Sequence, residues 1–130
     1  MSSDRNLSEI QRGLRSFEGF FNEEKLIDDI LRELFNGERI FITGIRKKGV
    51  LFGNPENLFL VLTDLRIIQY SKYGNITIFD PKDYYFTHSW GQLDLWKEGS
   101  GIAERLEMNF NHENREIFER YFKQVFAPKP

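Results

Sequence analysis

The residues best suited to attract an anionic partner lie together in one short segment. Three consecutive cations are followed, after a glycine, by three consecutive apolar residues: Arg46, Lys47, Lys48, Val50, Leu51 and Phe52. A cation close to an anionic bilayer contributes about 1 kcal/mol of attraction, and an apolar loop tip can insert beside it. We interpret the segment as a candidate site for lipid headgroups or an acidic partner. The alternative is that its apolar residues extend a strand and pack inside, while the cations are only solvated.

A second candidate surface is a narrow apolar stripe near the N-terminus. Its members recur at spacings of three and four residues, which places them on one face of a helix: Leu7, Ile10, Leu14, Phe17 and Phe21. Such a stripe can pack against the rest of its own domain. It can equally form a seam for self-association or for a partner helix, as in a coiled coil. The sequence leaves both alternatives open.

The sequence offers few groups for catalysis or metal binding. His88 and His112 are its two histidines, cysteine is absent, and neither an HExxH motif nor a GxSxG, P-loop or GxGxxG motif occurs. The carboxylates lie on predicted helix faces and turns, where they are solvated, rather than in a catalytic pair with separated pKa values. We therefore expect a protein that is not an enzyme and that uses no cofactor and no metal.

The composition limits the class of partner. The 130 residues suffice for one domain, and the net charge of −2 supplies no concentrated positive surface for a nucleic acid. The N-terminus lacks the apolar run of a signal peptide, and no stretch reaches the ~20 apolar residues of a membrane span. Together with the absence of cysteine, these features lead us to expect a cytoplasmic protein. The basic segment adds the alternative of a peripheral position at the membrane.

The elements that would position these residues change in character along the chain. Apolar residues repeat every three to four positions over 7–21 and 23–35, which predicts two helices. Farther along, the repeat shortens to two, and turn residues separate seven predicted strands: 39–45, 57–63, 65–71, 76–79, 84–90, 93–96 and 103–110. A last helix is expected after Asn111, with an apolar stripe at Ile117, Phe118, Tyr121, Phe122 and Val125. We expect 1–36 to be an N-terminal helical extension, 37–126 the main domain and 127–130 a flexible tail.

Two local details follow from the same patterns. Asn6 and Glu9 have the spacing of a capping box, so we expect the first helix to begin after Asn6. Strict alternation along the first strand would place Ile40 and Ile42 on one side of it, opposite Thr43 and its odd-numbered neighbours.

Three stretches of the sequence carry a family resemblance. They are Gly37-Glu38-Arg39-Ile40, LFLVLTDLRII over 58–68 and YGNITIFDPKDYYF over 73–86. These stretches resemble the bacterial pleckstrin-homology-like (PH-like) domain family. The resemblance implies an α+β, mainly β fold, namely a seven-stranded PH-like barrel or sandwich capped by a C-terminal helix and preceded by one or two N-terminal helices. Within the second stretch, we expect Arg66 to pair with a carboxylate or an exposed backbone carbonyl at the barrel surface.

The resemblance also implies a function. It implies a non-enzymatic binding or assembly module, whose partner is another protein or further copies of the chain in a homo-oligomer. PH domains that bind phosphoinositides carry basic residues between their first two strands. Peripheral membrane or anionic-lipid binding through the Arg46–Phe52 loop is therefore the alternative function.

Overall fold

The structure, a computed structural model, describes residues 2–17, 19–49, 53–110 and 112–130. Within these ranges the chain forms three α-helices, one short 3-10 helix and eight strands. They are α1 Ser2–Leu14, η1 Arg15–Phe17, α2 Glu23–Glu33, β1 Ile40–Lys48, β2 Glu56–Thr63, β3 Ile67–Tyr70, β4 Ile76–Phe79, β5 Tyr84–Ser89, β6 Gln92–Lys97, β7 Ala103–Arg105, β8 Glu107–Met108 and α3 His112–Val125. The predicted α+β class, rich in strands and ending in a helix, is confirmed.

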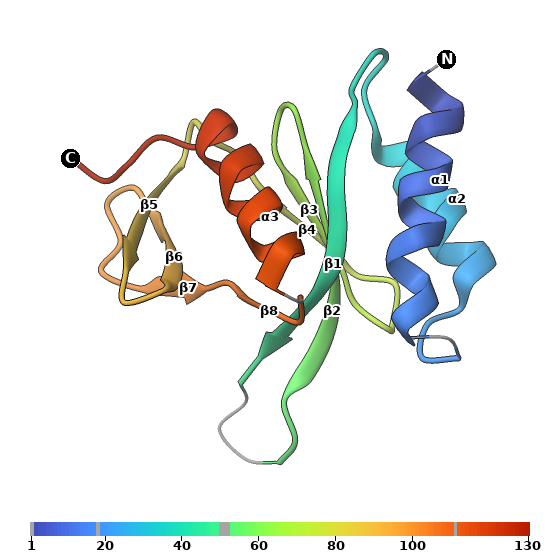
Figure 1. Cartoon of the computed structure of the whole chain (residues 1–130), viewed down its shortest axis with the longest axis horizontal. Helices are drawn as coiled ribbons and strands as arrows, with labels where there is room; N and C mark the ends of the chain where they lie inside the picture. Colours follow the sequence, from blue (N-terminus) through green and yellow to red (C-terminus); the bar gives the residue numbers. More distant parts are fainter. Residues whose placement is uncertain (1, 18, 50–52, 111) are drawn as a thin grey trace.

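The strands form two antiparallel sheets. The larger sheet has five strands in the order β4-β3-β2-β1-β8, and the smaller has three in the order β5-β6-β7. Figure 1 shows α1 and α2 on one side of the larger sheet, and α3 on its other side, between the two sheets. The two sheets share no strand in the described part of the chain, so the barrel is not closed. Of the predicted barrel or sandwich, a closed barrel is therefore not formed, and the described residues form eight strands rather than the predicted seven.

The larger sheet is buried on both faces, which explains why its central strand β2 is apolar throughout. Phe59 and Val61 pack beneath the N-terminal helices, in a cluster with Ile10, Leu14, Leu26 and Ile30. Leu60 and Leu62 point the other way, into a cluster with the smaller sheet and with Phe118, Phe122 and Phe126 of the C-terminal region. Fully burying such a side chain stabilises the fold by about 1.5–3 kcal/mol. The predicted stripe of the last helix is confirmed as part of this second core.

The N-terminal helices form one layer of the fold. The helix α1 begins at Ser2, and Asn6 lies inside it, so the predicted capping box is wrong. The Asn6 side chain instead donates to the Glu38 carbonyl at 2.9 Å and accepts from the Ile40 amide at 2.8 Å. It thus satisfies two backbone groups that the backbone of a neighbouring strand would otherwise satisfy. A methyl group on Gly13 would overlap the side chain of Thr43. Glycine at this position therefore allows α1 to approach β1 closely.

The first strand departs from strict alternation. Its pairing with β2 shifts register between Ile40 and Ile42, which is the signature of a β-bulge. The extra residue turns Ile40 toward the N-terminal helices, while Ile42 faces the second core. Phe41 stacks on Tyr121 of α3, with 4.5 Å between ring centroids. The expectation that Ile40 and Ile42 share a side is wrong, because the bulge inserts a residue between them.

The last strand and the tail also differ from expectation. The predicted strand 103–110 divides at Leu106 into β7, which pairs with β6, and β8, which pairs with β1. The tail was expected to be flexible. In the structure the Phe86 amide donates to the Ala127 carbonyl at 3.0 Å, and the Lys129 amide donates to the Phe86 carbonyl at 2.8 Å. These bonds attach the tail to the edge of β5.

A buried ion pair ties the end of α2 to the turn between β2 and β3. Arg66 donates through Nε to Oε2 of Glu38 and through a terminal nitrogen to Oε1, both at 3.0 Å. The Glu38 side chain is 0% exposed, and it also accepts from the Thr63 hydroxyl and the Phe35 amide. The expected pairing of Arg66 with a carboxylate is confirmed, but its expected location at the surface is wrong, because both side chains are buried. The Thr63–Arg66 stretch that carries the family resemblance thus has a structural role.

The carboxyl group of Glu38 is held in its charged form. Burial, the largest single influence, raises its pKa, but the hydrogen bonds from Arg66, Thr63 and the Phe35 amide together leave the pKa below its ordinary value of 4.5. A carboxylate whose pKa is lower in the folded state stabilises the fold above that ordinary pKa. The contribution is lost as the pH falls through the folded-state pKa.

We predict that Glu38→Gln lowers the free energy of unfolding by about 3 kcal/mol at neutral pH, because Arg66 loses its buried partner. The gap between wild type and variant should begin to shrink as the pH falls below 4.5, where Glu38 of the unfolded chain gains its proton, and should close as the pH falls through the lower folded-state pKa. Urea denaturation at a series of pH values measures the gap. The exposed Glu98→Gln is the matched control and should differ little from wild type at any pH. A gap for Glu38→Gln that does not change with pH would contradict this account.

Candidate functional site

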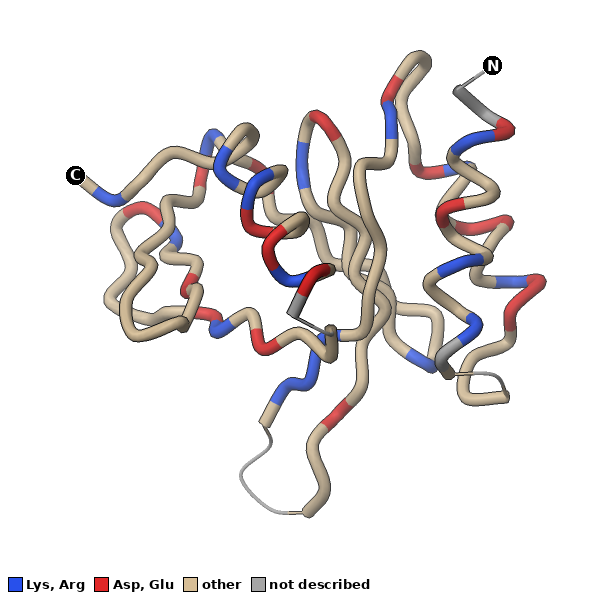
Figure 2. The backbone as a smooth tube through the Cα atoms, in the orientation of Figure 1, with Lys and Arg blue, Asp and Glu red and all other residues tan. Residues whose placement is uncertain are grey.

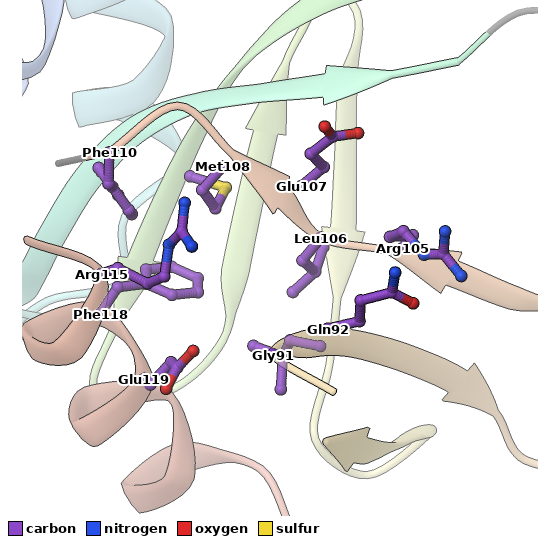
Figure 3. Close-up of a pocket in the computed structure, with 11 residues that line it drawn as sticks. Gly91, Gln92, Arg105, Leu106, Glu107, Met108, Phe110, Arg115, Phe118 and Glu119 are labelled. Carbon is purple, nitrogen blue, oxygen red and sulfur yellow. The ribbon is translucent and has the colours of Figure 1, made fainter. Parts of the chain in front are cut away.

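A pocket lies where the smaller sheet, β8 and the first half of α3 meet. Its volume is about 270 Å³, and we call it the seam pocket. Five apolar side chains and a polar rim line it, as Figure 3 shows for most of them: Leu93, Leu106, Met108, Phe110 and Phe118, with Gln92, Arg105, Glu107, Arg115 and Glu119. Gly91 completes the lining at the turn between β5 and β6.

The break in the last strand creates the pocket. The Leu106 amide still donates to the Leu93 carbonyl at 2.8 Å, on the smaller sheet. Three residues later the Asn109 amide donates to the Ile45 carbonyl at 2.8 Å, on the larger sheet. The chain therefore leaves one sheet for the other within these few residues, and the opening between the sheets is covered by α3.

Glycine in β1 makes room for the pocket wall. A methyl group on Gly44 would overlap the ring of Phe110, and it would lie 3.0 Å from the terminal carbon of Met108. A side chain at this position would push both residues into the pocket. Gly44 therefore helps to keep the seam pocket open.

Two charged groups of the rim have partners among the described residues, and Arg115 does not. The His88 Nε2 lies 3.4 Å from Oε1 of Glu119, which links β5 to α3. Arg105 lies 3.4 Å from Asp94 on the neighbouring strand. Arg115, in the first turn of α3, has no ion pair or side-chain hydrogen bond within the described residues.

An exposed tryptophan precedes the pocket lining. Trp90 and Gly91 connect β5 to β6 in a two-residue hairpin, between the paired residues Ser89 and Gln92. Both have positive φ, 54° for Trp90 and 72° for Gly91, and Trp90 is the one residue other than glycine with positive φ among those described. The left-handed conformation costs an ordinary residue about 1–2 kcal/mol. Trp90 is nevertheless 98% exposed, so little packing within the chain offsets this cost.

The basic segment does not form a single site. Arg46 is only 2% exposed and points between the sheets, where it donates to the Arg105 carbonyl at 3.1 Å and to Gln69 at 2.6 Å. A third bond, of 3.3 Å, reaches Glu104. Burial lowers the pKa of Arg46, and the nearby Glu104 acts in the opposite direction. Its donors already hold β1 against β7, so Arg46 is not part of the exposed basic surface, and its binding of an outside partner stays a prediction.

The rest of the segment is partly accessible. Lys47 and Lys48 are exposed and line an open groove of about 570 Å³ between the end of β1 and the strands β6 and β7. Lys48 lies 3.7 Å from Glu104. The remaining predicted residues, Val50, Leu51 and Phe52, lie outside the described residues.

The N-terminal stripe lies in the core of its own chain. Ile10, Leu14 and Phe21 are at most 5% exposed and belong to the cluster beneath the larger sheet, and Phe17 packs against that cluster. Leu7 is half-buried on α1. Of the two alternatives that the sequence left open, packing on its own domain is the one this structure contains.

Among the described residues, no group of three histidine, cysteine, aspartate or glutamate side chains could hold a metal ion. No helix in the described ranges is long and apolar enough to cross a membrane.

Sequence reasoning missed the seam pocket, the exposed Trp90 that precedes its lining in the sequence, and Arg115 of the lining. The pocket depends on the break at Leu106, which the alternating pattern of 103–110 does not reveal. Trp90 could have been found, because an aromatic residue directly before a hairpin glycine occupies a position that usually carries asparagine or aspartate.

Comparison with known proteins identifies no relative. No protein-family model, curated protein or solved structure matches the chain. The resemblance to PH-like domains therefore stays a prediction.

We predict that Arg46→Ala lowers the free energy of unfolding by about 3 kcal/mol, because Gln69 and Glu104 lose a buried cationic donor. The neighbouring Lys47→Ala is the control and should change the free energy of unfolding by no more than about 0.5 kcal/mol. Urea denaturation of the two variants measures both values. Equally small effects would contradict the bridging role of Arg46.

Proposed function

We propose that this chain is a non-enzymatic, PH-like binding module that docks a segment of a protein partner in the seam pocket. The observation that carries the proposal is Trp90. Its conformation is unfavourable for a tryptophan, its side chain is almost fully exposed, and the next residue, Gly91, lines the pocket. Backbone strain of this kind is concentrated at functional sites. Tryptophan is also among the residues that contribute most to binding at protein interfaces.

The size and lining of the pocket favour a protein segment over a small molecule. Sites for drug-sized ligands usually span about 300–1,000 Å³ and enclose the ligand. The seam pocket, at about 270 Å³, suits one or two side chains of a longer chain. Its apolar floor would bury those side chains, and Trp90, the residue before Gly91 of the lining, offers a further exposed aromatic surface to the same segment.

The arrangement of layers supports the PH-like part of the proposal. Two antiparallel sheets with a C-terminal helix between them agree with what the resemblance implies for the region after residue 36. The strand count differs by the break at Leu106, and the barrel is open there. A PH-like module with this opening would have its binding surface at the seam.

Trp90→Asn separates binding from folding. Asn-Gly is the preferred pair for this hairpin, so the variant should be as stable as wild type or more stable by up to about 1 kcal/mol. It should nevertheless lose at least about tenfold in affinity for peptides selected on the wild-type protein from a random displayed library. Fluorescence anisotropy of labelled peptides and urea denaturation measure the two effects.

The control for this variant is Tyr73→Asn, which removes an aromatic residue that is 75% exposed in another turn. It should leave peptide affinity unchanged. Selection that enriches no sequence, or enriched peptides that bind Trp90→Asn as tightly as wild type, would contradict the proposal. Enriched peptides whose sequences match a segment of this chain would identify self-association as the function.

A second candidate function, binding to an anionic membrane, is favoured by one cluster. Lys72 lies 5.0 Å from the ring of Tyr73 and 5.9 Å from the ring of Phe20, and both aromatic residues are exposed. The register of β1, β2 and β3 places this turn at the same end of the larger sheet as Lys47 and Lys48. Figure 2 shows basic residues at both places. Cations beside exposed aromatic rings suit the interface of an anionic bilayer.

We predict that, if this second function operates, the wild-type chain sediments with vesicles of phosphatidylcholine and phosphatidylserine but not with phosphatidylcholine alone. Lys47→Glu/Lys72→Glu should abolish the sedimentation by reversing two charges at that end. Lys82→Glu/Lys123→Glu makes the same change in net charge elsewhere and should retain it. Equal loss in both double variants, or no sedimentation of wild type, would exclude this surface.

A further inference from the structure

Arg115 is the one cation of the seam pocket without an ion pair or side-chain hydrogen bond in the described residues, and Glu107 is the one carboxylate of the lining without such a partner. Figure 3 shows its guanidinium group reaching from α3 across the pocket toward Met108, beside Phe110. The first turn of a helix is an unfavourable place for a cation, because the positive end of the helix dipole lies there. The position is therefore not explained by stabilisation of α3.

The other charges of the rim are engaged or turned away. Glu119 lies against His88, and Arg105 lies against Asp94. Figure 3 shows the Glu107 carboxylate on the side of β8 that points away from α3. A ligand lying between α3 and β8 would therefore meet Arg115 as its nearest unpaired charge.

Apolar surface lies directly beside this cation. Leu106, Met108 and Phe118 line the same pocket, and Phe118 is only 2% exposed. A guanidinium group next to such a surface binds a carboxylate more strongly than it would in open solvent, because the ligand removes water from the pair. The pocket thus combines a site for an apolar side chain with a site for an anion.

Resting on the proposed function, we infer that the docked segment carries an acidic side chain next to an aromatic or aliphatic one, with the carboxylate bound by Arg115 and the apolar group in the seam pocket. Capture of a chain terminus uses clustered backbone N–H groups. The charge here is a single guanidinium side chain, which favours a glutamate or aspartate within the segment.

Two blocked dipeptides that differ in one charge test the inference. They are acetyl-phenylalanyl-glutamate amide and its glutamine analogue, each titrated at millimolar concentration into the isotopically labelled chain and followed by backbone amide shifts. The acid should bind about threefold more tightly than the neutral analogue, as expected for a partly exposed ion pair. This preference should fall with added salt, because the pair is screened.

Arg115→Gln should remove the preference for the acid while leaving the neutral analogue unaffected. Arg120→Gln, an exposed site on the same helix, is the matched control and should retain it. Both variants should have the same midpoint of urea denaturation as the wild-type protein.

The outcomes separate the inference from the proposed function. Equal binding of both dipeptides in the seam pocket, or a preference that survives Arg115→Gln, would overturn the acidic-ligand inference and leave the docking proposal standing. Absence of shifts at Gln92, Leu106 and Glu119 with either dipeptide would overturn the inference and count against the pocket itself.

Discussion

The fold depends on the burial of the larger sheet on both of its faces. A sheet covered on two sides needs two apolar layers, and this chain supplies α1 and α2 on one side and α3 with the smaller sheet on the other. Two-sided burial also leaves no room for an unsatisfied polar group. Every buried side-chain nitrogen or oxygen of the described residues has a hydrogen-bond partner. Asn6, Glu38 and Arg46 are buried for this reason: each satisfies the backbone or a side chain at a place where two layers meet.

The same constraint decides where an outside partner can bind. The N-terminal stripe packs in the core of its own chain. The Arg46 side chain is occupied by hydrogen bonds between the two sheets. What is left is the place where the layers do not close, at the break beside Leu106. The seam pocket, Trp90 and Arg115 all belong to that place. The proposed function therefore follows from the opening between the two sheets rather than from a motif in the sequence.

Local patterns predicted the elements that are determined by local chemistry. The helix predicted over 23–35 is observed as Glu23–Glu33, with the expected cap at Asn22. The stripe of the last helix is also present, and both follow from apolar spacing and side-chain capping. The two-sided apolar run of β2 correctly indicated a central strand.

The side to which Ile40 points was not predictable, because a bulge is set by packing on both faces. Arg46 was misjudged for a related reason: alternation places it on the same inner side as Ile42, but three successive cations look like a solvated loop. The break at Leu106 depends on competition between two sheets, which no local pattern records.

The most direct test of the central claim is amide hydrogen exchange of the full chain with and without a peptide selected on it. The account predicts slower exchange on binding in residues 88–93, 105–110 and 113–119, which surround the seam pocket. Slower exchange confined to residues 46–49 and 71–75, at the end of the larger sheet that carries Lys47 and Lys72, would contradict it.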